Sequence, residues 1–168
     1  MMIDIRFPDG SVRSFEEGVT GYQIAESISP RLAADVLAVS VKADDDATVG
    51  KGNVIGLDTP IVKNSSIRLL KWDDPEGKHV FWHSSAHLMA QALEALYPGV
   101  KFGIGPALEN GFYYDVDLGD KVLSDNDLPA IEKKMLEFAH SKEAFQCTHV
   151  AKADALKYFN EKGDEYKV

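Results

Sequence analysis

The sequence of 168 residues has one cysteine, no long apolar run and no surplus of positive charge. Cys147 has no partner for an intramolecular disulfide, which excludes a disulfide-stabilised secreted scaffold and favours a reducing, cytoplasmic location. No apolar run approaches the roughly 18–20 residues that cross a bilayer, and the N-terminus lacks the basic and apolar regions of a signal peptide. The composition therefore predicts a globular protein without a membrane span.

Positive charge is scarce, with 18 Lys and Arg against 27 Asp and Glu. Residues 1–72 have 8 basic and 10 acidic side chains, whereas residues 73–168 have 10 and 17. Proteins that bind nucleic acid without sequence preference need extra Lys and Arg to displace counterions from the phosphates. Any contact with nucleic acid must therefore be local, or be made mostly by residues outside this sequence.

Residues 1–72 alternate between extended and helical patterns, as a small α+β domain does. Two extended segments at 2–7 and 12–15 flank a Pro-Asp-Gly-Ser turn, which predicts a hairpin. Thr20 and Gln23 have the spacing of a capping box and predict a short helix with Tyr22, Ile24, Ala25 and Ile28 as its apolar stripe. A second helical piece is expected at 31–35, and strands at 36–41, 54–57 and 66–72. This order in about 70 residues predicts a β-grasp (ubiquitin-like) unit.

The segment 73–77 is the clearest boundary, because it combines charge, proline and glycine. The second part is predicted to be α+β as well. Helices are expected over 79–97, from 128 onward with Asp127 as the cap, and over 152–162. Extended segments are expected over 100–104, 111–117 and 145–150. A hairpin turn is expected at 109–111. Since the last six residues resemble the start of another element, we expect a fragment of a longer chain.

The strongest candidate for chemistry is the HSSAH motif, with His83 and His87 on the first helix of the second part. Two residues four apart lie roughly 40° from each other around a helix axis, so these side chains share a face. His79 extends the row by one turn. A zinc-protease interpretation is excluded, because it needs Glu directly after the first His and Ser84 stands there. Such a pair is also common on ordinary surface or core helices.

A zinc site of another kind needs a third ligand, for which Asp115, Cys147 and His149 are candidates. The last two lie on a predicted strand, one face of which is normally core, so we expect no metal site. Cys147 has no recognisable base that would make it a nucleophile.

Two further motifs have simple structural interpretations. The GIGP motif at 103–106 lacks the Lys-Ser/Thr of a phosphate loop, and a tight bend between strands explains it better. In GFYYD at 111–115, alternation places Phe112 and Tyr114 on one face and Tyr113 on the other. One tyrosine hydroxyl could enter a pocket, and the pattern leaves open which.

Taken together, the motifs resemble the threonyl-tRNA synthetase family. WHSSAHLMAQAL at 82–93 and GIGPALENGFYYDVD at 103–117 resemble its editing region, and GDEYKV at the end resembles the stretch with its editing lysine. IRFPDGSV and QIAESI, nearer the start, resemble its small TGS domain. The resemblance covers essentially the whole chain. It implies a TGS domain at 1–72 and the N-terminal portion of the tRNA-editing domain, incomplete at its C-terminus, at 73–168.

Carried over residue by residue, the resemblance implies that His83 and Lys167 are catalytic and that His87, Gly105 and Tyr114 bind the substrate. The division of roles among them stays open. The family's pocket also uses a downstream Cys-x-x-x-His motif that this chain does not contain. We therefore expect the chain alone to be a poor or inactive editing enzyme.

The implied reaction is proofreading by hydrolysis of seryl-tRNA(Thr), with the tRNA acceptor end carrying serine and the rest of the synthetase chain as partners. In this family, ATP and zinc bind the aminoacylation core, and other domains form the homodimer. The resemblance places the core and these domains outside this sequence, so no cofactor is expected here. Two other functions stay open: a non-catalytic RNA- or protein-binding adaptor, and a metal-dependent hydrolase that uses the row of histidines.

Overall fold

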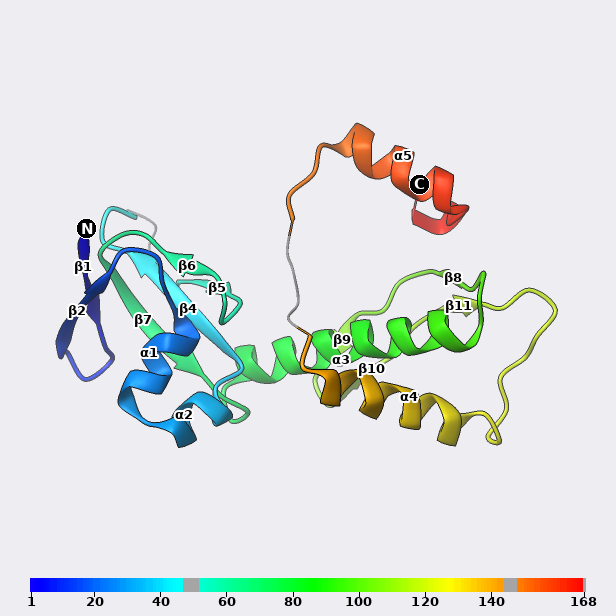
Figure 1. Ribbon diagram of the computed structural model, residues 1–168, viewed down its shortest axis with the longest axis horizontal. Coiled ribbons are helices and arrows are strands. Elements are labelled where there is room, and N and C mark those ends of the chain that lie inside the picture. The colour runs from blue at the N-terminus through cyan, green and yellow to red at the C-terminus, as the bar shows by residue number, and fades with distance from the viewer. Residues whose placement is uncertain (47–51, 144–147, 168) are drawn as a thin grey trace. The chain divides into compact units, whose positions relative to one another are not determined.

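The computed structural model describes residues 1–46, 52–143 and 148–167, which form two compact units, Met1–Phe81 and Trp82–Val168 (Figure 1). Helix α3 (Pro75–Leu96) begins inside the boundary segment expected at 73–77. The division between the two units falls later in the same helix, after Phe81. The predicted helix start at 79 was too late, because proline is tolerated in the first turn of a helix. Gly77 allows the backbone of Lys71 to lie close to the helix, since an added Cβ would overlap the carbonyl oxygen of Lys71.

The first unit contains a mixed five-stranded sheet in the order β2-β1-β7-β4-β5, so the α+β class predicted from the sequence is confirmed. β1 (Met2–Arg6) pairs antiparallel with β2 (Val12–Glu16), as the turn residues predict, and parallel with β7 (Ser65–Leu70). The other elements are β3 (Val19–Thr20), α1 (Gly21–Ile28), α2 (Pro30–Asp35), β4 (Ala38–Ala43), β5 (Asn53–Ile55) and β6 (Pro60–Ile61).

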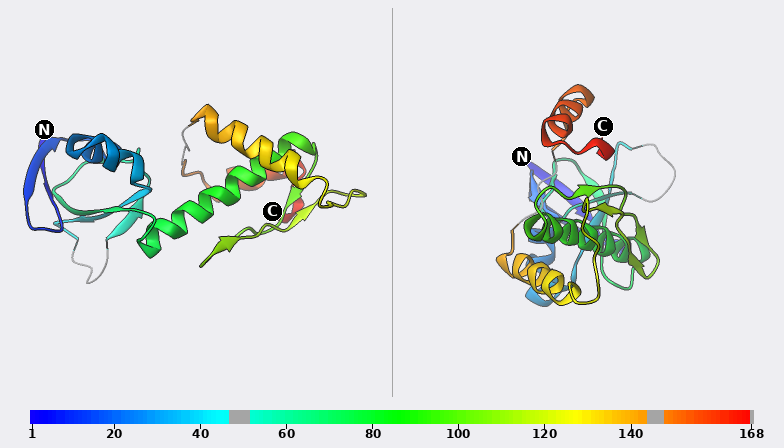
Figure 2. Two further views of the ribbon diagram at one scale, coloured as in Figure 1. Left: turned by 90° about the horizontal axis from the view of Figure 1, so that it is seen from below. Right: turned by 90° about the vertical axis from the view of Figure 1, so that its right-hand side faces the viewer.

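One face of this sheet is covered by α1 and α2 (Figures 1 and 2). The alternation along β1 buries Ile3 and Ile5, which contact Ile24 of α1 in the core of the unit. The predicted capping box starts α1: the Gln23 N–H donates to Thr20 Oγ1 at 3.2 Å, and the Thr20 N–H donates to Gln23 Oε1 at 3.0 Å.

The expected apolar stripe of α1 is only half buried. Ile24 and Ala25 are fully buried, whereas Tyr22 and Ile28 are 43% and 41% exposed. A helix of eight residues has little more than two turns, so residues at the margins of its stripe remain in contact with solvent.

The core of the second unit joins α3 to a β-ribbon and to a second long helix. Leu93 of α3, Phe102 and Ile131 are its buried centre. The remaining elements are β8 (Lys101–Phe102), β9 (Ala107–Leu108), β10 (Gly111–Phe112), β11 (Val116–Asp117), α4 (Leu128–Ser141), α5 (Lys152–Lys162) and a 3-10 helix, η1 (Glu165–Lys167). β9 pairs with β10 around the predicted hairpin turn, and β8 pairs with β11.

Two expectations for the second unit differ from the structure. Of the predicted strand at 145–150, residues 145–147 lie outside the described residues and residues 148–150 are in no strand. Asp127 precedes α4 as predicted, but its carboxylate makes no cap bond; it accepts instead from the backbone N–H and hydroxyl of Ser124. α5 has the predicted bounds. No helix in the described part of the chain is long and apolar enough to cross a membrane.

Candidate functional site

The two histidines of the HSSAH motif contact each other on α3. Their Nε2 atoms are 3.0 Å apart, and the ring centroids are 4.6 Å apart with the rings nearly perpendicular. A hydrogen bond between two ring nitrogens needs one donor and one acceptor, so at least one of the imidazoles in this contact is neutral. The helical spacing predicted that His83 and His87 share a face, and the structure adds that they are hydrogen-bonded.

The surroundings of His87 favour its neutral form. Burial lowers the pKa of the imidazole below its ordinary value of 6.5, and the nearby His83 and Lys167 lower it further. Both effects act against adding a positive charge. At neutral pH this ring is therefore a proton acceptor rather than a cation, as a general base must be.

A short β-ladder forms the opposite part of the site. The Gly103 N–H donates to the Asp115 carbonyl at 2.8 Å, and the Asp115 N–H donates to the Ile104 carbonyl at 3.0 Å, which continues the β8–β11 pairing. The ladder brings Gly105 against Tyr114: a Cβ at Gly105 would lie 2.7 Å from Tyr114 Cγ and closer still to the edge of the ring. Only glycine fits at this position without movement of the tyrosine.

The two tyrosines of the GFYYD motif have different surroundings. Tyr114 contacts the apolar core of the unit, and its ring lies edge-on to Phe102 at 5.4 Å and 69°. Tyr113, on the alternate face, is 45% exposed. Tyr114 is therefore the residue with a fixed ring beside Gly105.

Lys167 reaches this ladder from the end of the described chain. α5 ends at Gly163, whose φ of +75° is readily adopted by glycine, and η1 follows. The Lys167 ammonium donates to the Gly103 carbonyl at 2.7 Å and lies 5.8 Å from the centroid of the Tyr114 ring. A cation at this distance from an aromatic ring is attracted to it.

The structure thus brings the five predicted site residues into one unit, as a pair of histidines and a group around the ladder. Gly105 and Tyr114 are packed together, Lys167 lies against Tyr114, and its charge acts on the hydrogen-bonded pair of His87 and His83. Sequence reasoning missed Gly103 as the acceptor for Lys167, since the GIGP motif was interpreted only as a bend. A backbone acceptor leaves no mark in the residue type.

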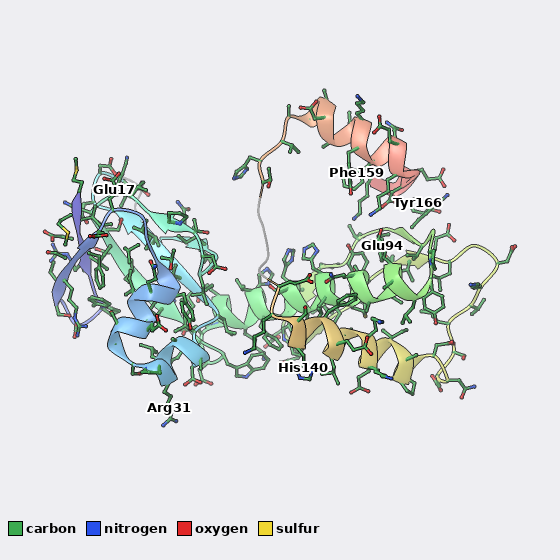
Figure 3. The ribbon with its side chains drawn as sticks, viewed as in Figure 1. Glu17, Arg31, Glu94, His140, Phe159 and Tyr166 are labelled. Carbon is green, nitrogen blue, oxygen red and sulfur yellow. The ribbon has the colours of Figure 1, made fainter. Side chains whose placement is uncertain are left out.

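Of the candidate third ligands for zinc, Asp115 lies on the ladder through its backbone. Cys147 lies outside the described residues, and His149 is exposed without regular secondary structure. No three His, Cys, Asp or Glu residues of 1–46, 52–143 and 148–167 are grouped so that they could hold a metal ion. The His pair supplies two nitrogens, and a zinc site needs at least one more protein ligand. His140 lies on α4 and is exposed (Figure 3).

Comparison with known proteins bears on the resemblance seen in the motifs. No family model matches the chain. It is 58% identical over 168 residues to the threonine–tRNA ligase of Porphyromonas gingivalis, 57% over 166 residues to that of Phocaeicola vulgatus, and 52% over 167 residues to that of Cytophaga hutchinsonii. Each match covers 99% of this chain and 24% of the relative, so the chain spans about a quarter of the length of these relatives. The resemblance to threonyl-tRNA synthetases noted in the motifs is therefore confirmed along the chain.

Proposed function

We propose that this chain is the part of a threonine–tRNA ligase that proofreads mischarged seryl-tRNA(Thr) by hydrolysing it. The observation that supports this most directly is that Lys167, which lies against Tyr114 beside Gly105, is near enough to lower the pKa of His87. His87 in turn is hydrogen-bonded to His83. This grouping combines a neutral proton acceptor, a cation and a closely packed glycine. Hydrolysis of an ester uses a proton acceptor and a positive charge, and a closely packed wall selects a small amino acid.

Serine differs from threonine by one missing methyl group. A binding pocket distinguishes such a pair only about 10–200-fold, so a second site that hydrolyses the smaller product is the usual solution. At Gly105 an added Cβ would overlap the Tyr114 ring, so the backbone of Gly105 and this ring are in close contact. We infer that this tight corner excludes the extra methyl of threonine.

The reaction joins a water oxygen to the serine carbonyl carbon and breaks the ester bond to the terminal ribose. A neutral imidazole of the His83–His87 pair accepts the proton from water, and the ribose oxygen finally gains a proton as the leaving group. The Lys167 ammonium has three N–H donors, one of which is on Gly103. It can stabilise the negative charge that develops on the carbonyl oxygen, or bind the ribose.

For the first unit we propose a TGS domain of β-grasp type without chemistry. Its hairpin, the helix that follows and the parallel contact of β1 with β7 support this assignment. Residues 1–72 contain no histidine, and their charge is nearly balanced. In the longer protein, ATP, zinc and the dimer contacts would belong to the remaining three quarters of its length.

The proposal is tested by titrating the protein with a non-hydrolysable adenosine that has serine attached through an amide at the 3′ position. Nuclear magnetic resonance should show saturable shifts at Gly105, Tyr114 and Lys167, and the threonine analogue should cause much weaker ones. His83→Ala should reduce the affinity, whereas His140→Ala, the matched change on α4, should not. Equal binding of both analogues, or shifts confined to the first unit, would contradict the proposal and favour a non-catalytic adaptor.

The rate of hydrolysis is a separate test. Deacylation of seryl-tRNA by residues 1–168 should be severely slower than by a longer chain that includes the Cys-x-x-x-His motif, at matched concentrations. Positioning of reacting groups is worth several orders of magnitude in rate, and an incomplete pocket loses much of it. Comparable rates would show that the chemistry lies wholly within these residues.

A further inference from the structure

The residues just before Lys167 are held by a pair of charged side chains that the reaction does not use. Lys101 and Asp117 are directly opposite each other across the β8–β11 pairing. Lys101 forms a salt bridge with Glu165, and Asp117 Oδ2 accepts a hydrogen bond from the Tyr166 hydroxyl at 3.1 Å. Two neighbouring residues of η1 are therefore held by two neighbouring positions of the ladder.

The two contacting residues on η1 and the two on the ladder are separated by the same number of positions. Glu165 precedes Lys167 by two residues, and Lys101 precedes Gly103 by two residues. The contacts of Lys101 with Glu165 and of Gly103 with Lys167 therefore run along the two segments in the same direction. The two contacts therefore share one register between the segments.

The segment from α5 to η1 does not join the buried apolar core of the unit. Within the described part of the second unit, no residue of α5 or η1 belongs to the buried core cluster, and α5 has no buried residue. The polar contacts of this segment with the rest of the unit include that of Lys162 with Glu94 at 2.6 Å, together with the contacts of Glu165 and Tyr166. The Lys101 ammonium also lies 6.0 Å from the centroid of the Tyr166 ring. Figure 3 shows Glu94 on α3 and Tyr166 at the end of the segment.

We propose that Lys101 and Asp117 are positioning residues, which bind Glu165 and Tyr166 and thereby keep the Lys167 ammonium on Gly103 and beside Tyr114. The importance of this for catalysis rests on the proposed editing function, whereas the positioning itself does not.

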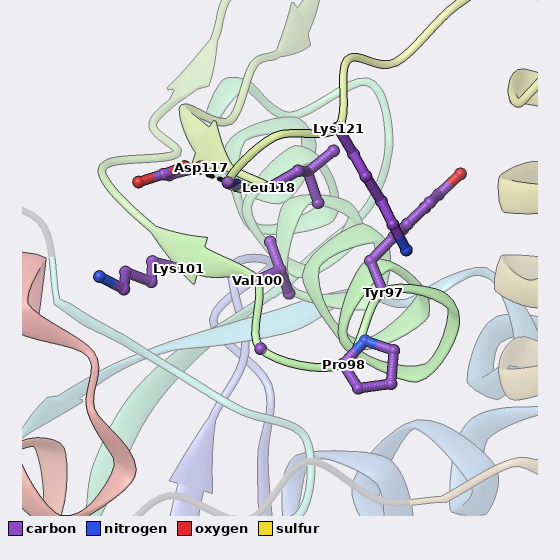
Figure 4. A pocket seen from close by; sticks show the side chains of 9 residues that line it. Tyr97, Pro98, Val100, Lys101, Asp117, Leu118 and Lys121 are labelled. Atoms are coloured by element: carbon purple, nitrogen blue, oxygen red, sulfur yellow. Dashed lines mark hydrogen bonds between the residues drawn. The ribbon is translucent and has the colours of Figure 1, made fainter.

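The surroundings of the pair are consistent with this role. Lys101 and Asp117 line a pocket of about 200 Å³ next to the end of α3. Figure 4 shows that both side chains point the same way, away from Tyr97 and Lys121 on the other side of that pocket. The contact with Glu165 is the main cause that raises the pKa of Lys101, and the bond to Asp117 is the main cause that raises the pKa of Tyr166.

The test measures how often Lys167 leaves its place. Limiting acylation of lysines, followed by mass spectrometry, gives a rate for Lys167 that rises in proportion to the fraction released. Lys101→Met and Tyr166→Phe should each raise this rate about two- to fivefold, the usual effect of an exposed polar contact, and the double variant about tenfold. Lys157, which is 76% exposed, should react at an unchanged rate and serves as the internal reference.

Conservative and matched variants separate positioning from general loss of structure. Lys101→Arg should keep the normal rate, and Glu165→Gln should behave as Lys101→Met does. Tyr22→Phe, which removes an exposed hydroxyl in the first unit, should change nothing. Nuclear Overhauser effects between the Lys167 side chain and the Tyr114 ring should weaken in the double variant, while its thermal melting remains normal. An unchanged Lys167 rate and unchanged Overhauser effects in the double variant would overturn the proposal.

The two proposals fail separately, because none of these measurements uses a substrate. If the contacts position Lys167 but Lys167→Met does not slow deacylation in the longer protein, the assigned role of Lys167 is wrong and the positioning stands. If Lys167→Met slows deacylation and Lys101→Met does not alter the acylation rate, the editing function stands and the positioning is wrong.

Discussion

The two units of this chain are stabilised differently. In the first, fully buried side chains such as Ile5, Ile24 and Leu70 connect the sheet to the helices. In the second, the strands are two residues long, and hydrogen bonds and charges join the candidate site residues. Apolar burial is strong but has no direction, whereas a hydrogen bond works only at a defined distance and angle. The second unit has an apolar core of its own, but its candidate site residues are joined by weaker, directional contacts.

The largest effect should separate the units by function. In a longer protein that contains the complete editing domain, His83→Ala should slow hydrolysis of seryl-tRNA at least about a hundredfold, since general acid–base catalysis contributes about 10²–10⁴. Deletion of residues 1–72 should leave the rate nearly unchanged. Single-turnover deacylation measures both. A hundredfold slower deacylation after deletion of residues 1–72 would place essential chemistry in the first unit. The two units would then not differ in function.

The next effect should separate them by stability. Ile5→Ala should lower the free energy of unfolding of the first unit by about 2–5 kcal/mol, because it opens a cavity at a fully buried position. Ile5→Val, the milder control, should cost about 0.5–1.5 kcal/mol. Urea unfolding followed by hydrogen exchange resolves the units. Equal loss of protection in both units after Ile5→Ala would show that they unfold as one.

Within the second unit, Gly105→Ala should damage the site without unfolding it. The new methyl group must displace the Tyr114 ring, which Phe102 contacts from the other side, and overpacking of this kind costs about 1–3 kcal/mol. Binding of the serine analogue should weaken rather than become less selective. Gly99→Ala, at a glycine with open space around it but a positive φ, is the control for stability alone. Unimpaired serine binding by Gly105→Ala would remove the tight corner from the proposal.

A smaller effect concerns pH. The pKa of His87 should lie below 6.5, and Lys167→Met should raise it slightly because a nearby positive charge is removed. Unfolded His87 then binds a proton at a higher pH than folded His87 does. The free energy of unfolding should therefore fall as the pH drops below about 6.5. A titration of the His87 ring by nuclear magnetic resonance measures the shift, and a value above 6.5 would contradict the observed burial.

The smallest effect should come from charged pairs outside the site. Lys63 and Asp45 are 2.7 Å apart in the first unit, but both side chains are more than half exposed. Solvent and salt screen such a pair, so Lys63→Met should leave the urea midpoint unchanged within error. A clear loss of stability would mean that polar contacts also support the first unit, which would weaken the contrast drawn above.

Local chemistry was predicted well from the sequence. The capping box of Thr20 and Gln23, the hairpin turn at 8–11 and the exact span of α5 each depend on neighbouring residues, and all three are present in the structure. The start of α3 was misplaced, because Pro75 and Gly77 are breakers inside a helix and acceptable in its first turn. The candidate site residues came from the resemblance, and only the HSSAH spacing could be derived from helix geometry.

The sequence by itself determined the capping box of α1, the span of α5 and the shared face of His83 and His87, because these follow from contacts within a few residues along the chain. Only the tertiary structure decided that Lys167 lies on Gly103, 64 positions away, and that Lys101 and Asp117 hold the residues before it. Such contacts depend on which segments the fold brings side by side, and a lysine or a glycine carries no mark of its distant partner. The burial that lowers the pKa of His87 is decided in the same way, since it comes from the folding of the unit around the helix.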